Sequence, residues 1–269
     1  MAVTNFIQTI WSKKIQDDLL PECKLVQNCT RNYEGDAKYA STVKILGVGR
    51  PTVKDYDRVA GITPEEMTDK GQELAIDQAK AFAFFVDDID KAQSVPGLPE
   101  EYQRLSVLEL ALARDTYIAN LIKGATNVTT ADELSREAVK DAIDKAIVAL
   151  RLRHFAEDGV IELDPRAYNV FKNELITLST NNPEYIKRGI VGMYDNFEVI
   201  MSTNMAVDST HVYCDIRGKK AIAFAGQINE VEAFRSQTHF KDVVRGLDTF
   251  GAKIIDQDRI QGIKIPLTA

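Results

Sequence analysis

A long polar stretch with extended segments on both sides of it constrains the fold of this chain more than any other feature of its sequence. Residues 42–46 and 51–56 read as extended, residues 58–71 are polar, and residues 73–86 read as extended again. Glycine and proline recur in the polar stretch, which is rich in charge and has almost nothing to bury. The pattern predicts a long two-stranded excursion with a charged tip.

The strand signal is clearest at the end of this region. Phe82, Phe84 and Val86 alternate with the residues between them, and this period of two places one set on each face of a sheet. A hairpin of only two strands is marginally stable in water. We therefore expect the excursion to lie against the same subunit or against another one, and an unsupported surface loop is the alternative reading.

The first 39 residues suit an arm better than a core element. Scattered apolar side chains, among them Trp11, precede Pro21 and predict a short amphipathic helix, whereas residues 33–39 are polar. Terminal segments are ordered when something ties them down. We therefore expect this arm to lie on a neighbour.

A long helix is predicted to follow the proline and glycine residues at 96–99 and to continue to Lys123, where Gly124 ends it. It would span about 24 residues, or roughly 36 Å. Two apolar stripes predict that it is covered on more than one side, as an organising spine. The first stripe contains Leu105, Leu108, Leu112 and Ala119, and the second contains Tyr102, Leu110, Ala113, Tyr117 and Leu121.

A second helix is predicted to begin at a capping box formed by Thr130 and Glu133. Its apolar stripe is regular and indicates packing on one face: Leu134, Ala138, Ile143, Ile147 and Leu150. Residues 160–163 then read as a strand, Pro165 opens a short helix through Phe171, and short strands alternate with turns after it. This order predicts an α+β fold.

Composition limits the class of protein. A chain of 269 residues with 45% hydrophobic content can bury its core in one large domain or two smaller ones. The net charge is −7, and the sequence has no cluster of lysine and arginine residues of the kind with which proteins bind nucleic acid. No window approaches the roughly 18 uninterrupted apolar residues of a membrane helix, and the first residues lack a secretion signal. We therefore expect no membrane partner and synthesis in a cytoplasm.

The motifs that would indicate chemistry are weak. Asp88 and Asp90 match the carboxylate pair with which glycosyltransferases hold a divalent ion, although acids after a strand more often solvate a turn. Gly47 and Gly49 lack the third glycine and the following helix of a dinucleotide fingerprint. We expect no cofactor.

The remaining candidate groups are cysteines and histidines. Three cysteines at no metal spacing predict reduced thiols, and three histidines that are far apart in sequence form no metal motif. They are Cys23, Cys29 and Cys214, and His154, His211 and His239.

The order of these pieces resembles the major capsid proteins of tailed bacteriophages, which have the Hong Kong 97 fold. The strongest match is Asp77 to Gln93, which is similar to the family's return strand and the turn into its spine helix. Further segments resemble the family in the same order: 1–11, 33–36 with 42–45, 115–118, 160–168, 192–204 and 224–253. No single segment is specific, but their order over nearly the whole chain is.

The resemblance implies five parts along the chain. They are an N-terminal arm at 1–40, an extended loop with its return strand at 41–95, a peripheral domain with the spine helix at 96–160, a mainly axial domain at 161–250, and a C-terminal strand returning to the core at 251–269.

The function implied is structural and not enzymatic: self-assembly as hexamers and pentamers into an icosahedral shell around double-stranded DNA, without sequence-specific binding. Separate scaffolding, portal and decoration proteins are possible further partners, and the chain would be made in the host bacterial cytoplasm and end in the virion capsid. The residues expected at contacts between subunits are Lys44, Lys54, Arg58, Glu65, Glu66, Asp69, Lys70 and Trp11.

Two alternatives stay open at this point. An encapsulin, a bacterial nanocompartment of the same fold, would enclose a cargo enzyme in place of a genome. A metal-dependent transferase would use Asp88 and Asp90, and would be a monomer or a small oligomer that binds manganese.

Overall fold

The computed structural model describes residues 23–33, 42–45, 55, 71–87, 98–155, 157–178, 192–235 and 241–267. The helices are α2 (Lys24–Gln27), α4 (Leu98–Lys123), α5 (Arg136–Leu152), α6 (Pro165–Leu178) and the short 3-10 helix η2 (Gln257–Arg259). The strands are β1 (Thr42–Ile45), β2 (Gln72–Ala75), β3 (Gln78–Asp87), β4 (Val128–Thr130), β5 (Gly159–Leu163), β6 (Met193–Tyr194), β7 (Phe197–Met201), β8 (His211–Gly218), β9 (Ile222–Arg235), β10 (Lys241–Ile254) and β11 (Ile260–Pro266).

An elongated unit consists of α4 and a three-stranded antiparallel sheet in the order β3-β10-β9. The alternation predicted in β3 is confirmed, because Phe82 and Phe84 pack against the core while Phe85 is exposed. On β10, Val244 and Phe250 are buried on the same side of the sheet. The ring of Tyr117, from α4, meets that of Phe250 edge-on at 5.6 Å between centroids.

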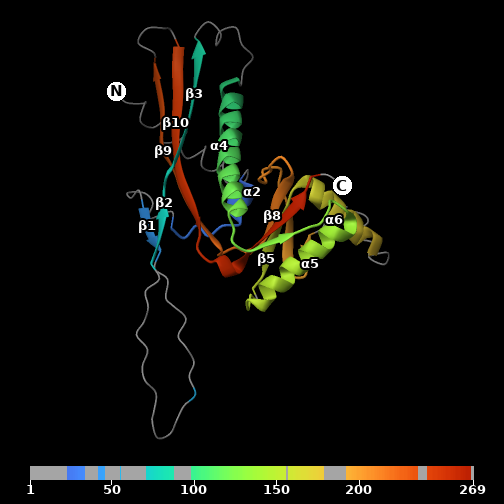
Figure 1. The fold of residues 1–269 in the computed structure, drawn as a ribbon. Coiled ribbons are helices and arrows are strands. Elements are labelled where there is room, and N and C mark those ends of the chain that lie inside the picture. The colour runs from blue at the N-terminus through green and yellow to red at the C-terminus, as the bar shows by residue number, and fades with distance from the viewer. Residues whose placement is uncertain are drawn as a thin grey trace.

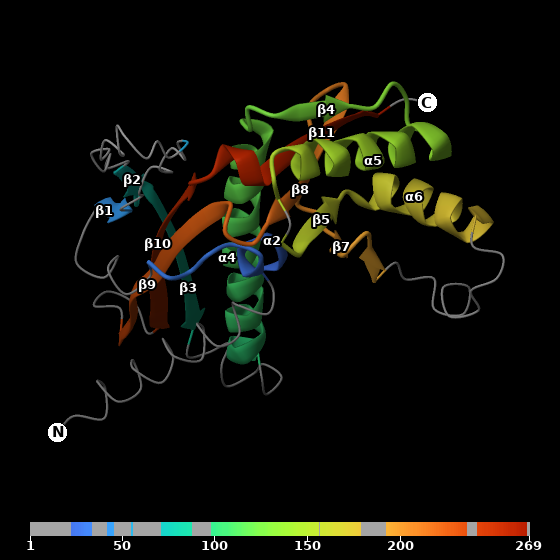
Figure 2. The ribbon, with the colours of Figure 1, turned by 90° about the horizontal axis from the view of Figure 1, so that it is seen from below.

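A six-stranded mixed sheet, in the order β4-β11-β8-β5-β7-β6, extends to one side of this unit, with α5 and α6 beside it (Figures 1 and 2). The buried side chains of α5 recur at helical spacing: Val139, Ala142, Ile143, Ala146, Ile147 and Leu150. All five residues of β5 are buried, which is expected of a strand in the middle of a sheet. The predicted α+β class is confirmed.

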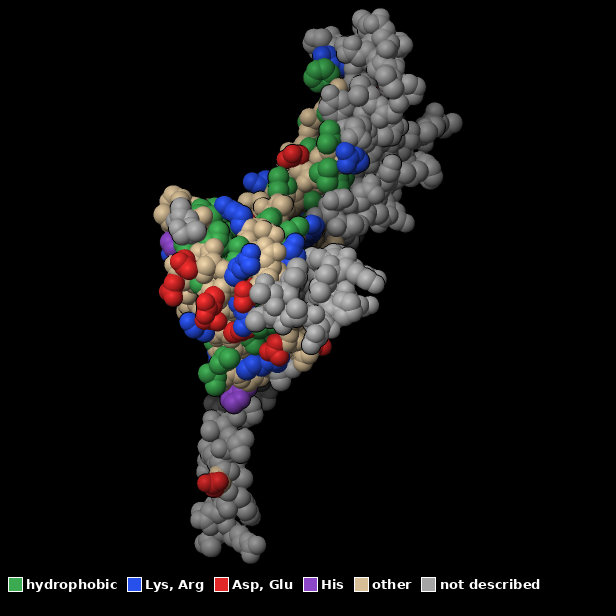
Figure 3. Space-filling model, turned by 90° about the vertical axis from the view of Figure 1, so that its right-hand side faces the viewer, with side chains coloured by type: hydrophobic (Ala, Val, Ile, Leu, Met, Phe, Trp, Pro, Cys, Tyr) green, Lys and Arg blue, Asp and Glu red, His purple; other side chains and the backbone are tan. Residues whose placement is uncertain are grey.

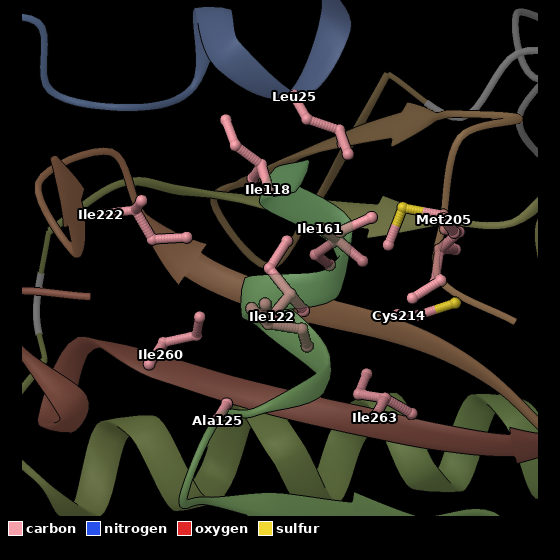
Figure 4. Close-up of a cluster of buried hydrophobic side chains, with 14 of the residues drawn as sticks. Leu25, Ile118, Ile122, Ala125, Ile161, Met205, Cys214, Ile222, Ile260 and Ile263 are labelled. Carbon is pink, nitrogen blue, oxygen red and sulfur yellow. The ribbon is translucent and has the colours of Figure 1, made fainter. Parts of the chain in front are cut away.

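A short segment near the N-terminal end lies in the core between the two units. Leu25 of α2 lies toward Ile118 and Ile122 of α4 in Figure 4, and Ile260 of β11 belongs to the same cluster. Leu25 and Val26 fall within the predicted arm and are fully buried in their own subunit, while the bounds of the arm stay a prediction. The earlier part of the arm, including Trp11, lies outside the described residues.

The base of the predicted two-stranded excursion is confirmed. β1 and β2 pair antiparallel, with Val43 opposite Leu74 and Lys44 opposite Glu73. The buried side chains of this ladder pack on Ala223 and Ala225 at the start of β9, so its base lies against its own subunit. The predicted charged tip, 58–71, lies outside the described residues apart from Gly71.

The capping box predicted at Thr130 and Glu133 is wrong. Thr130 belongs to β4, which pairs parallel with β11, and α5 begins only at Arg136. Its N-cap is Ser135, whose hydroxyl accepts a hydrogen bond from the amide of Ala138 at 3.3 Å.

The C-terminal end was predicted correctly for one of the other two helices and too early for the second. The long helix ends at Lys123 as predicted. The helix that begins at Pro165 continues to Leu178, beyond the predicted end at Phe171.

The two stripes predicted on α4 differ in their burial. Leu110 of the second stripe is buried, but Leu105 and Leu112 of the first are 45% and 44% exposed. The subunit therefore does not cover the first stripe along its whole length. Among the described residues, no helix is both long enough and apolar enough to cross a membrane.

The predicted peripheral and axial ranges stay a prediction, and the packing of the elements cuts across them. β9 and β10, from the predicted axial range, pair with β3 and lie beside α4. α5, from the predicted peripheral range, contacts α6 and β11 of the six-stranded sheet.

Candidate assembly surfaces

The outer face of the three-stranded sheet, turned away from α4, carries exposed aromatic side chains. Phe85 of β3, Val243 of β10 and Phe234 of β9 stand opposite one another across the three strands. Phe85 is 62% exposed and Phe234 is 44% exposed. We call the side chains of Phe85, Phe234 and Leu247, with Ala81 and Ala83 between them, the outer sheet face.

Cations accompany both of these aromatic rings. The Lys241 ammonium lies 4.1 Å from the centroid of Phe85, and the Arg245 guanidinium lies 5.1 Å from that of Phe234. Arg245 also donates a hydrogen bond of 2.7 Å to Glu232 on β9. The outer sheet face therefore combines apolar area with fixed charge, which suits a surface that binds in one register.

A hollow of about 330 Å³ opens on this face, lined by Ala81, Phe82, Ala83, Glu232, Arg245, Gly246 and Leu247. Small residues create it, because alanines occupy the outward positions 81 and 83 of β3. Gly246 has a separate role: a Cβ atom there would clash with the ring of Phe82. A side chain from outside the subunit can fill such a hollow without moving the sheet.

A second exposed apolar surface runs along α4. Leu105 and Leu112 are seven residues apart, and half-buried Leu108 lies between them, so the three share one side of the helix. In Figure 3 the part of the molecule that carries α4 shows mostly hydrophobic and uncharged side chains, whereas acidic side chains gather on the part that carries α5 and α6.

The positions of the predicted contact residues are described in part. Lys44 is exposed on β1, because Val43 and Ile45 on either side of it face inward. Lys54, Arg58, Glu65, Glu66, Asp69, Lys70 and Trp11 lie outside the described residues. Their position relative to Lys44 stays a prediction.

Sequence reasoning missed the outer sheet face. The alternation placed Phe85 on the opposite side of the strand from Phe82 and Phe84. The sequence alone does not show whether that side is exposed or covered by another element. Leu247 of β10 and Phe234 of β9 join Phe85 on one face only because β10 pairs with both β3 and β9.

Within the described residues, the candidates for chemistry form no common site. Asp88 and Asp90 lie outside the described residues, and within the described ranges no group of three acidic, histidine or cysteine side chains is placed to hold a metal ion. His154 is exposed, and the Nδ1 atom of His211 lies 2.6 Å from the hydroxyl of Thr210 in a surface turn. The three cysteines are free and buried.

Asp208 organises that surface turn. Its carboxylate accepts hydrogen bonds from the amides of Thr210 and His211 and from the hydroxyl of Tyr213. These bonds hold the pKa of Asp208 well below its usual range. The turn is ordered locally and has a structural role.

Solved structures share this fold over most of the chain. The structure of Mycobacterium phage Che8 matches with a TM-score of 0.77 and 26% identity, covering 88% of this chain and 89% of that one. The capsid structure of the Cyanophage P-SCSP1u matches with a TM-score of 0.70 and 12% identity, covering 86% and 84%. An encapsulin from Synechococcus elongatus matches with a TM-score of 0.57 and 9% identity, covering 86% and 84%.

No protein-family model and no curated protein matches the chain by sequence. The structural neighbours at the higher TM-scores are tailed-phage capsids, which accords with the resemblance in the sequence. The chain has a structural role and assembles with copies of itself. It has the Hong Kong 97 fold and the role of a capsid shell protein, similar to the capsid proteins of tailed bacteriophages.

Proposed function

We propose that this chain is the major capsid protein of a tailed phage, assembling as hexamers and pentamers into a closed icosahedral shell around double-stranded DNA. A closed shell repeats a few contacts many times, so individually weak contacts give a durable particle. The net charge of −7 suits a shell that encloses DNA without gripping it. The chain would be made in the bacterial cytoplasm and would carry out no catalysis.

The outer sheet face is the observation that carries this proposal. Covering a phenylalanine side chain contributes about 1.5–3 kcal/mol, and Phe85 keeps 62% of its surface exposed in the isolated subunit. Phe234 and Leu247 extend the same face. A neighbouring subunit that covers this face would remove the apolar area from water and pair with Lys241, Arg245 and Glu232 around it.

The excursion and the arm would supply reach between subunits. Lys44 stands exposed at the base of the excursion, and the sequence places the other charged candidates beyond it: Lys54, Arg58, Glu65, Glu66, Asp69 and Lys70. Charges at such contacts favour the correct register more than they raise affinity. Trp11 would anchor the arm through its apolar ring.

The experiment is assembly of variants at the outer sheet face. Phe85→Ser should leave the subunit folded, because the side chain is exposed, but should lower the yield of particles at least tenfold. Phe85→Leu, the matched control, keeps an apolar contact and should assemble within about threefold of the parent. Electron microscopy and size-exclusion chromatography measure assembly, and circular dichroism measures folding; normal particles from Phe85→Ser would overturn this assignment.

A second arm of the same experiment tests the excursion. Charge reversal at Lys44, Lys54, Arg58, Glu65 and Glu66 together should leave the monomer folded and block particle formation, because the register between subunits depends on these charges. Normal particles from this variant would remove the contact role of the excursion and leave that of the outer sheet face intact.

The alternatives make different predictions. An encapsulin would retain a protein cargo, so particles that co-purify with one enzyme and lack a genome would favour it. A transferase using Asp88 and Asp90 would bind manganese tightly as a small oligomer, and calorimetry without manganese binding would dispose of it.

A further inference from the structure

A fully buried ionic cluster lies between α2 and the six-stranded sheet. The Nη2 atom of Arg217, on β8, donates hydrogen bonds to both carboxylate oxygens of Glu162, on β5, at 2.8 and 2.7 Å. Its Nε atom lies 3.0 Å from Oδ2 of Asp215. All three side chains have no exposed surface.

The charges of this cluster do not balance when every group is ionised. Two carboxylates face one guanidinium, which leaves a net charge of −1 out of contact with water. Glu162 and Asp215 stand directly opposite one another on adjacent antiparallel strands, where side chains are near neighbours. One proton bound at Asp215 would make the cluster neutral, and burial of the charge favours this state.

The lack of hydrogen bonds to the Asp215 carboxyl group disfavours its charged form, because a buried carboxylate without donors is costly. Within the described part of the chain, neither of its oxygens accepts a properly aligned hydrogen bond, although the ion-pair distance to Arg217 is short. Burial, together with the negative charge of Glu162, raises the pKa of Asp215 well above its usual value, and Arg217 opposes this shift. Two buried thiols also lie near the cluster: burial raises the pKa of Cys29 to about 11 and that of Cys214, next to Asp215 on β8, to about 12, so both stay protonated.

The same cluster holds α2 in place. Arg217 donates a hydrogen bond to the carbonyl oxygen of Leu25 at 3.2 Å and another to the sulfur of Cys29 at 3.3 Å. The side-chain amide of Asn28 donates to Glu162 at 2.8 Å. Arg217 and Glu162 therefore both contact the segment 24–29, and Asp215 is linked to it through Arg217.

The opposite side of α2 is held by α4. The carboxylate of Asp115 accepts hydrogen bonds from the amides of Lys24, Leu25 and Val26, and another from the side chain of Asn204. Figure 2 shows α2 between α4 and the strands β5 and β8. The segment thus joins the two units of the subunit, with the ionic cluster on one of its sides.

We propose that this cluster is a proton-dependent latch, which holds the segment 24–29 against the six-stranded sheet while the buried Asp215 carries a proton and releases it when that proton is lost. A second buried negative charge without a cation is costly. Undocking of the segment would let water reach both carboxylates and reduce that cost. The latch concerns the subunit itself and goes beyond assembly of the shell.

The direction of the pH dependence follows from the raised pKa of Asp215. Its pKa in the docked state lies above that in the undocked state, so the docked state binds the additional proton. The stabilisation from this group is fully present below the undocked pKa and is lost as the pH rises through the docked pKa. Alkaline pH therefore favours release, by at most about tenfold for each pH unit for a single proton.

The test is alkylation of the buried thiols in the full chain, measured for each peptide by mass spectrometry between pH 5 and pH 10, a range that begins close to the ordinary pKa of a carboxyl group. At each pH, the rate is divided by that of the urea-unfolded protein, which removes the effect of thiolate formation. The protection of Cys29 should fall by about tenfold or more across this range, while Cys214, buried on the sheet, stays protected. Joint loss of protection at both thiols would indicate global unfolding and overturn the proposal.

Asp215→Asn is the matched variant, because it removes the surplus charge and keeps a side chain of the same size and shape. Its Cys29 protection should vary less than about twofold over the same range. Glu162→Gln removes the surplus charge from the other member of the pair, so it replaces Asp215→Asn if that variant does not fold. The proposal is wrong if the folded variant releases Cys29 with the same pH dependence as the parent.

Discussion

The guanidinium of Arg114 lies buried between α4 and β10, where it donates hydrogen bonds to both carboxylate oxygens of Asp248 at 2.8 and 2.6 Å. It also lies over the rings of Phe224 and Phe250. A buried pair of this geometry satisfies both charges, but either partner alone would be a desolvated charge. The pair therefore fixes the position of α4 on the sheet.

Asp248→Ala should lower the free energy of unfolding by about 3–5 kcal/mol, because it leaves Arg114 buried without a counter-charge. Glu198→Ala is the matched control: its pair with Lys219 is 3.6 Å long and more than half exposed, so the loss should stay below about 1 kcal/mol. Urea unfolding followed by circular dichroism measures both. If both variants lose the same free energy of unfolding, burial does not determine how much the Arg114 pair contributes to stability.

Sequence reasoning had no means of finding this pair or the Glu162, Asp215 and Arg217 cluster. Arg114 and Asp248 are 134 positions apart and meet only because β10 lies beside α4. Each of these side chains alone reads as an ordinary surface charge. Buried ionic groups of this kind are determined by tertiary packing, and a local pattern does not contain them.

At the scale of elements, the periodicity of apolar residues predicted the features that depend only on neighbouring residues in the sequence. The long helix ends at the predicted residue, and the alternation in β3 matches its faces. The start of α5 was predicted wrongly because Thr130 belongs to β4. This strand pairs with β11, which lies far along the chain, so Thr130 is extended and caps no helix. A capping motif competes with strand pairing, and here the long-range partner decides.

The corrected helix start gives a matched pair of variants. Ser135→Ala should lower the free energy of unfolding by about 1 kcal/mol, because it removes the hydroxyl that accepts from the amide of Ala138. Thr130→Ala should change it by less than about 0.5 kcal/mol, since Thr130 is exposed on β4 and caps no helix. Thermal and urea unfolding distinguish the two, and a larger effect at Thr130 would restore the capping box.

At the scale of the molecule, the order of elements along the chain predicted the fold, and the surfaces came only from the structure. Phe85 was visible in the sequence as one side of an alternating strand, whereas the outer sheet face requires β3 to pair with β10, which together with β9 comes from much further along the chain. The charged candidates of the excursion remain predictions apart from the exposure of Lys44. A subunit with an uncovered apolar face and an extended excursion is suited to bind copies of itself.

The most direct measurement of this account is the particle mass and image of the purified chain, by light scattering and electron microscopy of the same sample. The account predicts closed shells or capsomers far heavier than the 30.0 kDa monomer. A chain that stays a folded monomer at every concentration and salt condition, with Phe85→Ser indistinguishable from the parent, would contradict it.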